Sequence, residues 1–66
     1  MTDITDWKNI EGKEVHIETR SGLHYSGKVL KVEIFENPKL IWITILDIKN
    51  MQITFVHSEI QRMEVK

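Results

Sequence analysis

Residues 23–35 read LHYSGKVLKVEIF, and this stretch decides the predicted fold. Apolar or small residues occupy every second position from 25 to 29, as expected of a β-strand. From residue 30 to residue 34 the alternation continues on the other parity, which predicts a bulge or bend. Gly27 within the run favours the close approach of another backbone. We therefore predict a long, strongly curved strand of the kind that a small barrel requires.

Further runs of alternating apolar and polar residues lie on both sides of this stretch. Ser21-Gly22 predicts a tight turn before it, and Pro38 breaks the pattern after it. Residues 40–46 are apolar on both parities. This predicts a strand that is either central and covered on both faces, or that places one face in the barrel and the other against the helix or a neighbouring subunit. The predicted strands span about 13–20, 23–35, 40–48, 52–57 and 60–65.

A short helix is predicted ahead of the first strand. Ile4, Trp7 and Ile10 recur at intervals of three, and Gly12 stands where helices commonly stop. These signals predict a helix over about residues 4–11 with an apolar stripe. The predicted fold is all-β: a short N-terminal helix followed by a strongly bent five-stranded antiparallel barrel.

Size and charge narrow the possible functions. The 66 residues form one domain, residues 1–66, and a chain of this length buries only about 60% of its unfolded surface. Since the chain has no cysteine, oligomerisation is the remaining common source of extra stability. Nine Lys and Arg residues against ten Asp and Glu residues give a net charge of −1. This balance provides no global field that attracts nucleic acid, so any RNA binding requires a local patch.

The sequence also suggests where the protein resides. Its first residues show no positive segment followed by an apolar one, and the lack of cysteine fits a reducing compartment. We expect a cytoplasmic protein. No membrane association is expected, because the longest apolar run falls well short of the roughly 20 residues that span a bilayer.

Several motifs together resemble the Sm-like family (Sm, Lsm and Hfq proteins). Residues 7–17 look like the family's helix end and first strand, and Gly22 and Gly27 flank an aromatic residue in a similar way. Residues 32–40 resemble the first Sm motif: an acid, any residue, an aromatic, a stacking residue, Asn, two residues and Leu. Residues 56–60 stand where the second motif is expected. The resemblance covers nearly the whole chain and implies an SH3-like barrel with a helix.

The resemblance also implies a ring of identical subunits. In the family, the fourth strand of one subunit pairs with the fifth strand of the next. By this resemblance, strand 52–57 of one chain pairs with strand 60–65 of its neighbour. The same assembly follows from a separate argument, since unpaired strand edges are a liability that ring closure removes.

Single-stranded RNA is the ligand that the resemblance implies, at the loops after the second and fourth strands. Asn37 would bond a base edge, Glu33 would support the loop, and His57 would take the place of a basic contact residue. The implied RNA-binding residues are Phe35, Glu36, Asn37, Lys39, His57 and Ser58. Glu36 departs from the family pattern, because a carboxylate has no π face and repels phosphate. We therefore expect weak binding or a non-standard preference.

Other readings of these residues remain open. Phe35 is more simply a core or loop-anchoring aromatic than a base platform. The chain is alternatively a protein-interaction scaffold without RNA binding, or a monomeric SH3-like barrel with a peptide groove. No catalytic residues are expected, because adjacent positions such as His57 and Ser58 point to opposite faces of an extended chain. The three histidines show no metal-ligand spacing, and we expect neither a metal nor a cofactor.

Overall fold

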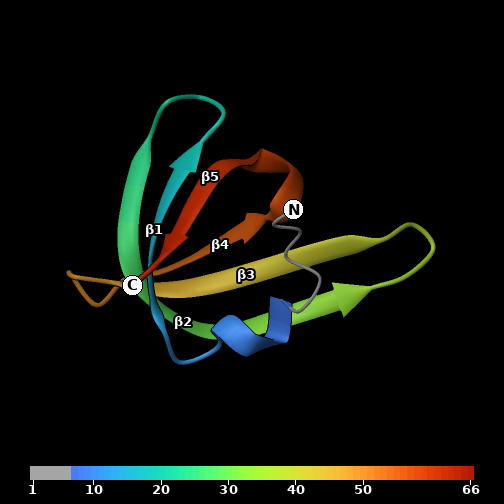
Figure 1. The fold of residues 1–66 in the computed structure, drawn as a ribbon, viewed down its shortest axis with the longest axis horizontal. Helices are drawn as coiled ribbons and strands as arrows, with labels where there is room; N and C mark the ends of the chain where they lie inside the picture. The colour runs from blue at the N-terminus through green and yellow to red at the C-terminus, as the bar shows by residue number, and fades with distance from the viewer. Residues whose placement is uncertain (1–6) are drawn as a thin grey trace.

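The computed structural model describes residues 7–66. Within this range the chain forms five strands and two short 3-10 turns (Figure 1). The elements in order are η1 (Trp7–Ile10), β1 (Glu14–Thr19), β2 (His24–Phe35), β3 (Leu40–Asp47), β4 (Gln52–Val56), η2 (His57–Glu59) and β5 (Ile60–Val65). The predicted all-β class and its five antiparallel strands are confirmed.

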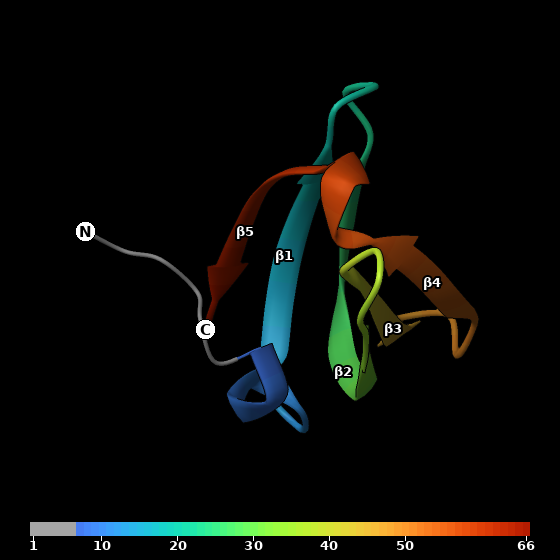
Figure 2. The same ribbon diagram turned by 90° about the vertical axis from the view of Figure 1, so that its right-hand side faces the viewer.

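The five strands form one antiparallel sheet in the order β4-β3-β2-β1-β5. Figure 2 shows how this sheet curls: β5 and β1 lie on one side of the molecule, β3 and β4 on the other, and β2 runs between them. The edge strands β4 and β5 do not pair with each other within residues 7–66. Closure into the predicted barrel stays a prediction.

The curvature comes from two positions on β2. Leu30 is an extra residue in the ladder with β3, since the register shifts between Val29 and Lys31, and this confirms the predicted bulge. Gly27 confirms the predicted close approach, because a Cβ placed there would collide with the backbone carbonyl of Leu46. Only glycine lets β3 come this near to β2.

The core lies inside the curl and is built from the inward-facing residues of the strands together with Ile10 of η1. Register places Val32 opposite Ile43 on this face, and both are fully buried. The buried apolar residues are Ile10, Val15, Ile17, Val29, Val32, Ile41, Ile43, Ile45 and Phe55.

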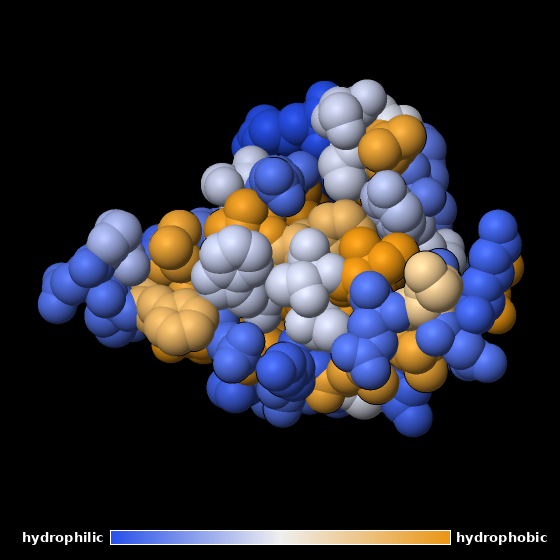
Figure 3. All heavy atoms as spheres, turned by 180° about the vertical axis from the view of Figure 1, so that it is seen from behind, coloured by the Kyte–Doolittle hydropathy of each residue, from blue (hydrophilic) through white to orange (hydrophobic). Residues whose placement is uncertain are grey.

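The outer face of β3 is also apolar, as the sequence predicts. Leu40, Trp42 and Leu46 alternate with the core residues of β3 and are half-buried. Phe35 and Val56 extend this apolar face onto β2 and β4, because they pair with Leu40 and Trp42. Figure 3 shows this side of the molecule, with apolar and weakly polar side chains across it and charged groups around them.

The predicted helix is wrong in type and length within the described residues. Trp7–Ile10 is a 3-10 turn of four residues that packs against β2, with Ile10 buried. An apolar interval of three fits 3.0 residues per turn better than the 3.6 of an α-helix. The first part of the predicted helix, including Ile4, lies outside residues 7–66.

A carboxylate fixes the end of this turn to the sheet. Glu11 accepts a hydrogen bond of 2.7 Å from the backbone N–H of Val32, and Lys8 Nζ lies 3.5 Å from the same oxygen. The Val32 hydrogen bond, helped by Lys8, holds the pKa of Glu11 below its ordinary value of 4.5, although burial opposes this. The charged carboxylate therefore satisfies a donor on β2.

The described chain has little helix. No helix in residues 7–66 has the length and apolar character needed to pass through a membrane.

Candidate nucleic-acid interface

The turn between β2 and β3 forms the tip of the longest hairpin. Its four residues, Glu36 to Lys39, are all exposed, and Figure 1 shows the tip projecting from one end of the molecule. Asn37 takes a left-handed conformation with φ of 60°, which Asn tolerates better than most residues. Phe35 directly before the turn is 48% exposed and is not a core residue. The predicted aromatic, amide and cation thus lie together at this tip.

Glu33 lies further back on β2, opposite Trp42. Its carboxylate is 3.9 Å from Lys31 Nζ, and both side chains are about half exposed. Within the described chain, Glu33 makes no hydrogen bond to the turn, so the structure shows no direct contact for its predicted supporting role. A surface ion pair of this kind contributes little to stability.

His57 begins η2 and is held on two sides. Its Nδ1 accepts a hydrogen bond of 3.2 Å from the backbone N–H of Ile41. The Trp7 ring lies edge-on to the imidazole, with ring centroids 6.3 Å apart. Since Nδ1 is an acceptor here, the neutral ring carries its proton on Nε2. Nε2–H is therefore the donor that His57 can offer to a ligand.

Ser58 and Glu59 are tied to the β1–β2 turn through their backbone. The Ser58 carbonyl accepts a hydrogen bond of 2.8 Å from the side-chain Nε of Arg20. The Glu59 carbonyl accepts one of 3.0 Å from the backbone N–H of Arg20. Both side chains are exposed. Arg20 thus holds η2 in place, and sequence reasoning gave it no role.

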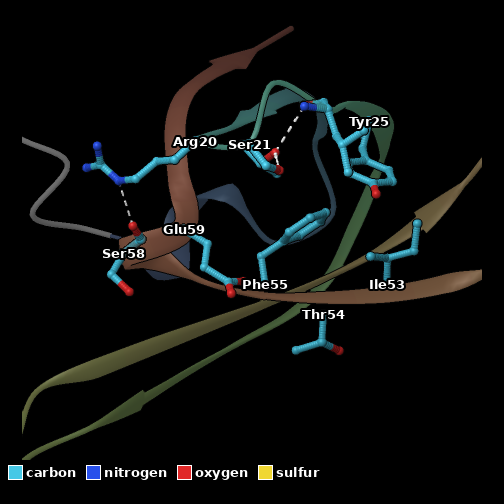
Figure 4. A pocket seen from close by; sticks show the side chains of 10 residues that line it. Arg20, Ser21, Tyr25, Ile53, Thr54, Phe55, Ser58 and Glu59 are labelled. Carbon is cyan, nitrogen blue, oxygen red and sulfur yellow. Dashed lines mark hydrogen bonds between the residues drawn. The ribbon is translucent and has the colours of Figure 1, made fainter.

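A groove of about 480 Å³ opens between this β1–β2 turn and β4 (Figure 4). Tyr25 and Phe55 line it with their ring centroids 5.1 Å apart. Its other lining residues are Thr19, Arg20, Ser21, Leu23, Ile53, Thr54, Ser58 and Glu59. The predicted RNA-binding residues all belong to the described part of the chain, and among them only Ser58 lines this groove. Sequence reasoning missed the groove because its walls come from strands that are not neighbours in the sheet.

The predicted site residues fall into two groups. One group surrounds the β2–β3 turn, and the other belongs to η2. The link between them is the hydrogen bond to His57 from Ile41, which lies on β3 two residues after the turn. Among residues 7–66, no hydrogen bond or ion pair joins Glu36, Asn37 or Lys39 to η2. One chain therefore presents two neighbouring but separate parts of the predicted interface.

The described chain offers no ready-made cluster of metal ligands. No group of three or more His, Cys, Asp or Glu side chains within residues 7–66 converges closely enough to hold an ion.

Comparisons with known protein families, with curated proteins and with solved structures find no match to this chain. The resemblance to the Sm-like family therefore rests on the sequence motifs.

Proposed function

We propose that this chain assembles into an Sm-like ring of identical subunits and that the ring binds single-stranded RNA. The observation that carries the proposal is the strand order β4-β3-β2-β1-β5, because it leaves β4 and β5 as the two edges. These are the strands that the family resemblance pairs between subunits. Each edge offers backbone N–H and C=O groups that a neighbouring copy can pair.

The groove beside β4 supports the same assembly. Ile53 and Phe55 form its wall on β4, and Leu23 on the opposite side is 53% exposed. Ile60 and Met63 on β5 are half-buried and pair with the inward-facing residues of β1. A neighbour's β5 added to β4 would bring this inner face next to the groove. Its apolar side chains would then cover surface that one chain leaves exposed.

The exposed β2–β3 turn is the RNA contact in this proposal. Lys39 supplies a cation, Asn37 supplies amide donors and acceptors, and the half-exposed ring of Phe35 supplies a face for base stacking. A ring gathers one such turn from every subunit, which compensates for the near-neutral charge of the single chain. Glu36 at the tip repels phosphate and offers no face for stacking, so binding is weak or has a non-standard base preference.

His57 contributes as a neutral donor in this proposal. Because the Ile41 N–H occupies Nδ1, a base carbonyl can accept a hydrogen bond from Nε2–H. A neutral donor of this kind discriminates between bases more than it attracts phosphate.

Two measurements test the proposal. Light scattering at micromolar concentration gives the mass, and a monomer mass excludes the ring. Fluorescence anisotropy with labelled oligo-U and oligo-A at low and moderate salt gives RNA affinity. We expect an oligomer whose RNA affinity falls as salt rises. An oligomer that binds neither oligonucleotide at low salt removes the RNA half of the proposal.

A second candidate is a ring or barrel that acts as a protein-interaction scaffold. The apolar outer face with Phe35, Leu40 and Trp42 favours it (Figure 3), as does the net charge of −1. A pull-down that recovers a partner after nuclease treatment, and loses it in Trp42→Lys, would support this candidate over RNA binding.

A further inference from the structure

We propose that His16 and His24 form a two-histidine site for a divalent transition-metal ion such as Zn²⁺ or Ni²⁺. The site lies on the β1–β2 hairpin and uses none of the residues of the proposed RNA interface. His16 Nε2 and His24 Nδ1 are 3.2 Å apart, with ring centroids 5.3 Å apart and planes inclined by 33°.

Strand register brings these two side chains together. Antiparallel pairing places His16 opposite Ser26 and Glu18 opposite His24, so both histidines lie on the face opposite to the core residues Val15 and Ile17. They are diagonal neighbours across the hairpin, a separation that long side chains can bridge. The seven residues between them in sequence hide this proximity.

The separation of the two nitrogen atoms suits a shared metal ion. Imidazole nitrogens bind zinc at about 2.0–2.1 Å, which places two ligands on a tetrahedral ion about 3.3 Å apart. In the structure the two nitrogens face each other in a hydrogen bond. The ion takes the place of the proton that the two nitrogens share, and the exposed His24 then binds it through Nδ1 while carrying its own proton on Nε2.

Ser26 orients the ring of His16. Its hydroxyl lies 2.8 Å from His16 Nδ1. With the proton on Nδ1 donated to the Ser26 oxygen, Nε2 keeps its lone pair for the metal. A partner at the second nitrogen fixes the tautomer in the same way in protein metal sites.

The charges around the pair are mixed. Strand pairing places Glu64 opposite His16 and Arg62 opposite Glu18 from the β5 side. On the β2 side, Lys28 lies opposite Glu14. The carboxylates favour a bound cation, the basic groups oppose it, and the imidazoles must be neutral to bind. Metal affinity therefore falls on acidification.

The remaining coordination positions belong to water, because no third His, Cys, Asp or Glu joins the pair within residues 7–66. Two imidazoles predict modest affinity, with Cu²⁺, Ni²⁺ and Zn²⁺ preferred over Mg²⁺ and Ca²⁺.

Calorimetric titration with Zn²⁺ and NMR titration with paramagnetic Ni²⁺ test the site. We expect one ion per chain, with broadening centred on residues 16, 24 and 26. His24→Ala should weaken binding by about tenfold or more. His57→Gln, which removes the third histidine and keeps an acceptor for the Ile41 N–H, should leave the metal affinity unchanged. His24→Asn is a second variant that keeps a polar side chain, and circular dichroism confirms the fold of each.

Three outcomes would overturn the proposal. The first is the absence of saturable binding up to about 1 mM metal. The second is an unchanged affinity in both His24 variants. The third is broadening centred on His57. None of these outcomes bears on ring assembly or RNA binding.

Discussion

The backbone N–H of Ile41 donates a hydrogen bond to Nδ1 of His57 across 3.2 Å. Strand β4 ends one residue earlier, where Val56 pairs with Trp42. Continued pairing would set the backbone of His57 beside Ile41, and the imidazole takes that place. The side chain thus satisfies a donor on β3 that the strand no longer reaches.

Replacing His57 with Phe should destabilise the fold, because it keeps a ring beside Trp7 and removes the acceptor for the Ile41 N–H. An unmet donor in this setting costs about 1–3 kcal/mol of unfolding free energy. Urea unfolding followed by circular dichroism measures this loss. His57→Gln, which retains an acceptor, should lose less, and equal stability of both variants with the wild type would contradict the argument.

Gly27→Ala should destabilise the sheet by about 1–3 kcal/mol, because the added methyl group meets the Leu46 carbonyl of β3. For a domain of this size, the melting temperature falls by about 4–8 °C for each kcal/mol. Lys28→Ala, at the exposed neighbouring position, serves as the control and should melt close to the wild type. An equal melting temperature for Gly27→Ala would show that β3 can move away without cost.

Stability should decline in acid through Glu11. Its folded pKa lies below the ordinary value of 4.5 because the Val32 N–H bonds the charged form. The stabilising contribution is thus complete above the unfolded pKa and is lost as pH falls from about 4.5 through the folded pKa. Glu11→Gln should flatten this part of a plot of unfolding free energy against pH. A profile identical to that of the wild type would exclude this role.

Gln61→Pro should reduce the mass of the assembly. Gln61 is the bulged residue of β5 and has no partner on β1, so proline is compatible with the single chain there. It removes one backbone N–H from β5, the strand that the ring proposal pairs with a neighbour. Gln61→Ala keeps the N–H and is the matched control. Light scattering that gives the same oligomer mass for both variants would place the subunit contact elsewhere.

Lys39 and Lys49 provide a matched pair for RNA binding. Both are exposed lysines in turns at opposite ends of β3 (Figure 1). Lys39→Ala should weaken oligonucleotide binding and reduce the salt slope by about 0.7 for each phosphate that the lysine neutralises. Lys49→Ala should change neither quantity. Equal weakening in the two variants, measured by anisotropy, would point to non-specific attraction.

Glu36→Gln should strengthen binding to the same oligonucleotides, because it removes a negative charge from the tip of the turn. The gain should shrink as salt rises, since screening weakens the repulsion in the wild type. Unchanged affinity at low salt would show that RNA does not approach this turn.

The sequence predicted the strands well because their signals are local. Alternation follows directly from the pleat, and the parity slip near Leu30 marks a bulge that the structure confirms. The interval of three around Trp7 was present in the sequence, but a 3-10 turn shares it with a short helix.

Contacts that depend on strand order were not predictable in the same way. The groove joins Tyr25 on β2 to Phe55 on β4 across the curl of the sheet. The contact of His16 with His24 requires the register of a hairpin, which shifts completely with one residue of turn length. Motif resemblance identified the exposed turn and η2, but not the role of Arg20 between η2 and the β1–β2 turn.

The open edge of β4 has a thermodynamic consequence. If copies of the chain complete each other's sheets, folding and association share one equilibrium, and dilution favours the unfolded chain. The melting temperature would then rise with protein concentration. The melting temperature of a domain that folds as a monomer does not depend on concentration in this way. The amount of protein present in a cell would in that case set how much of it is folded.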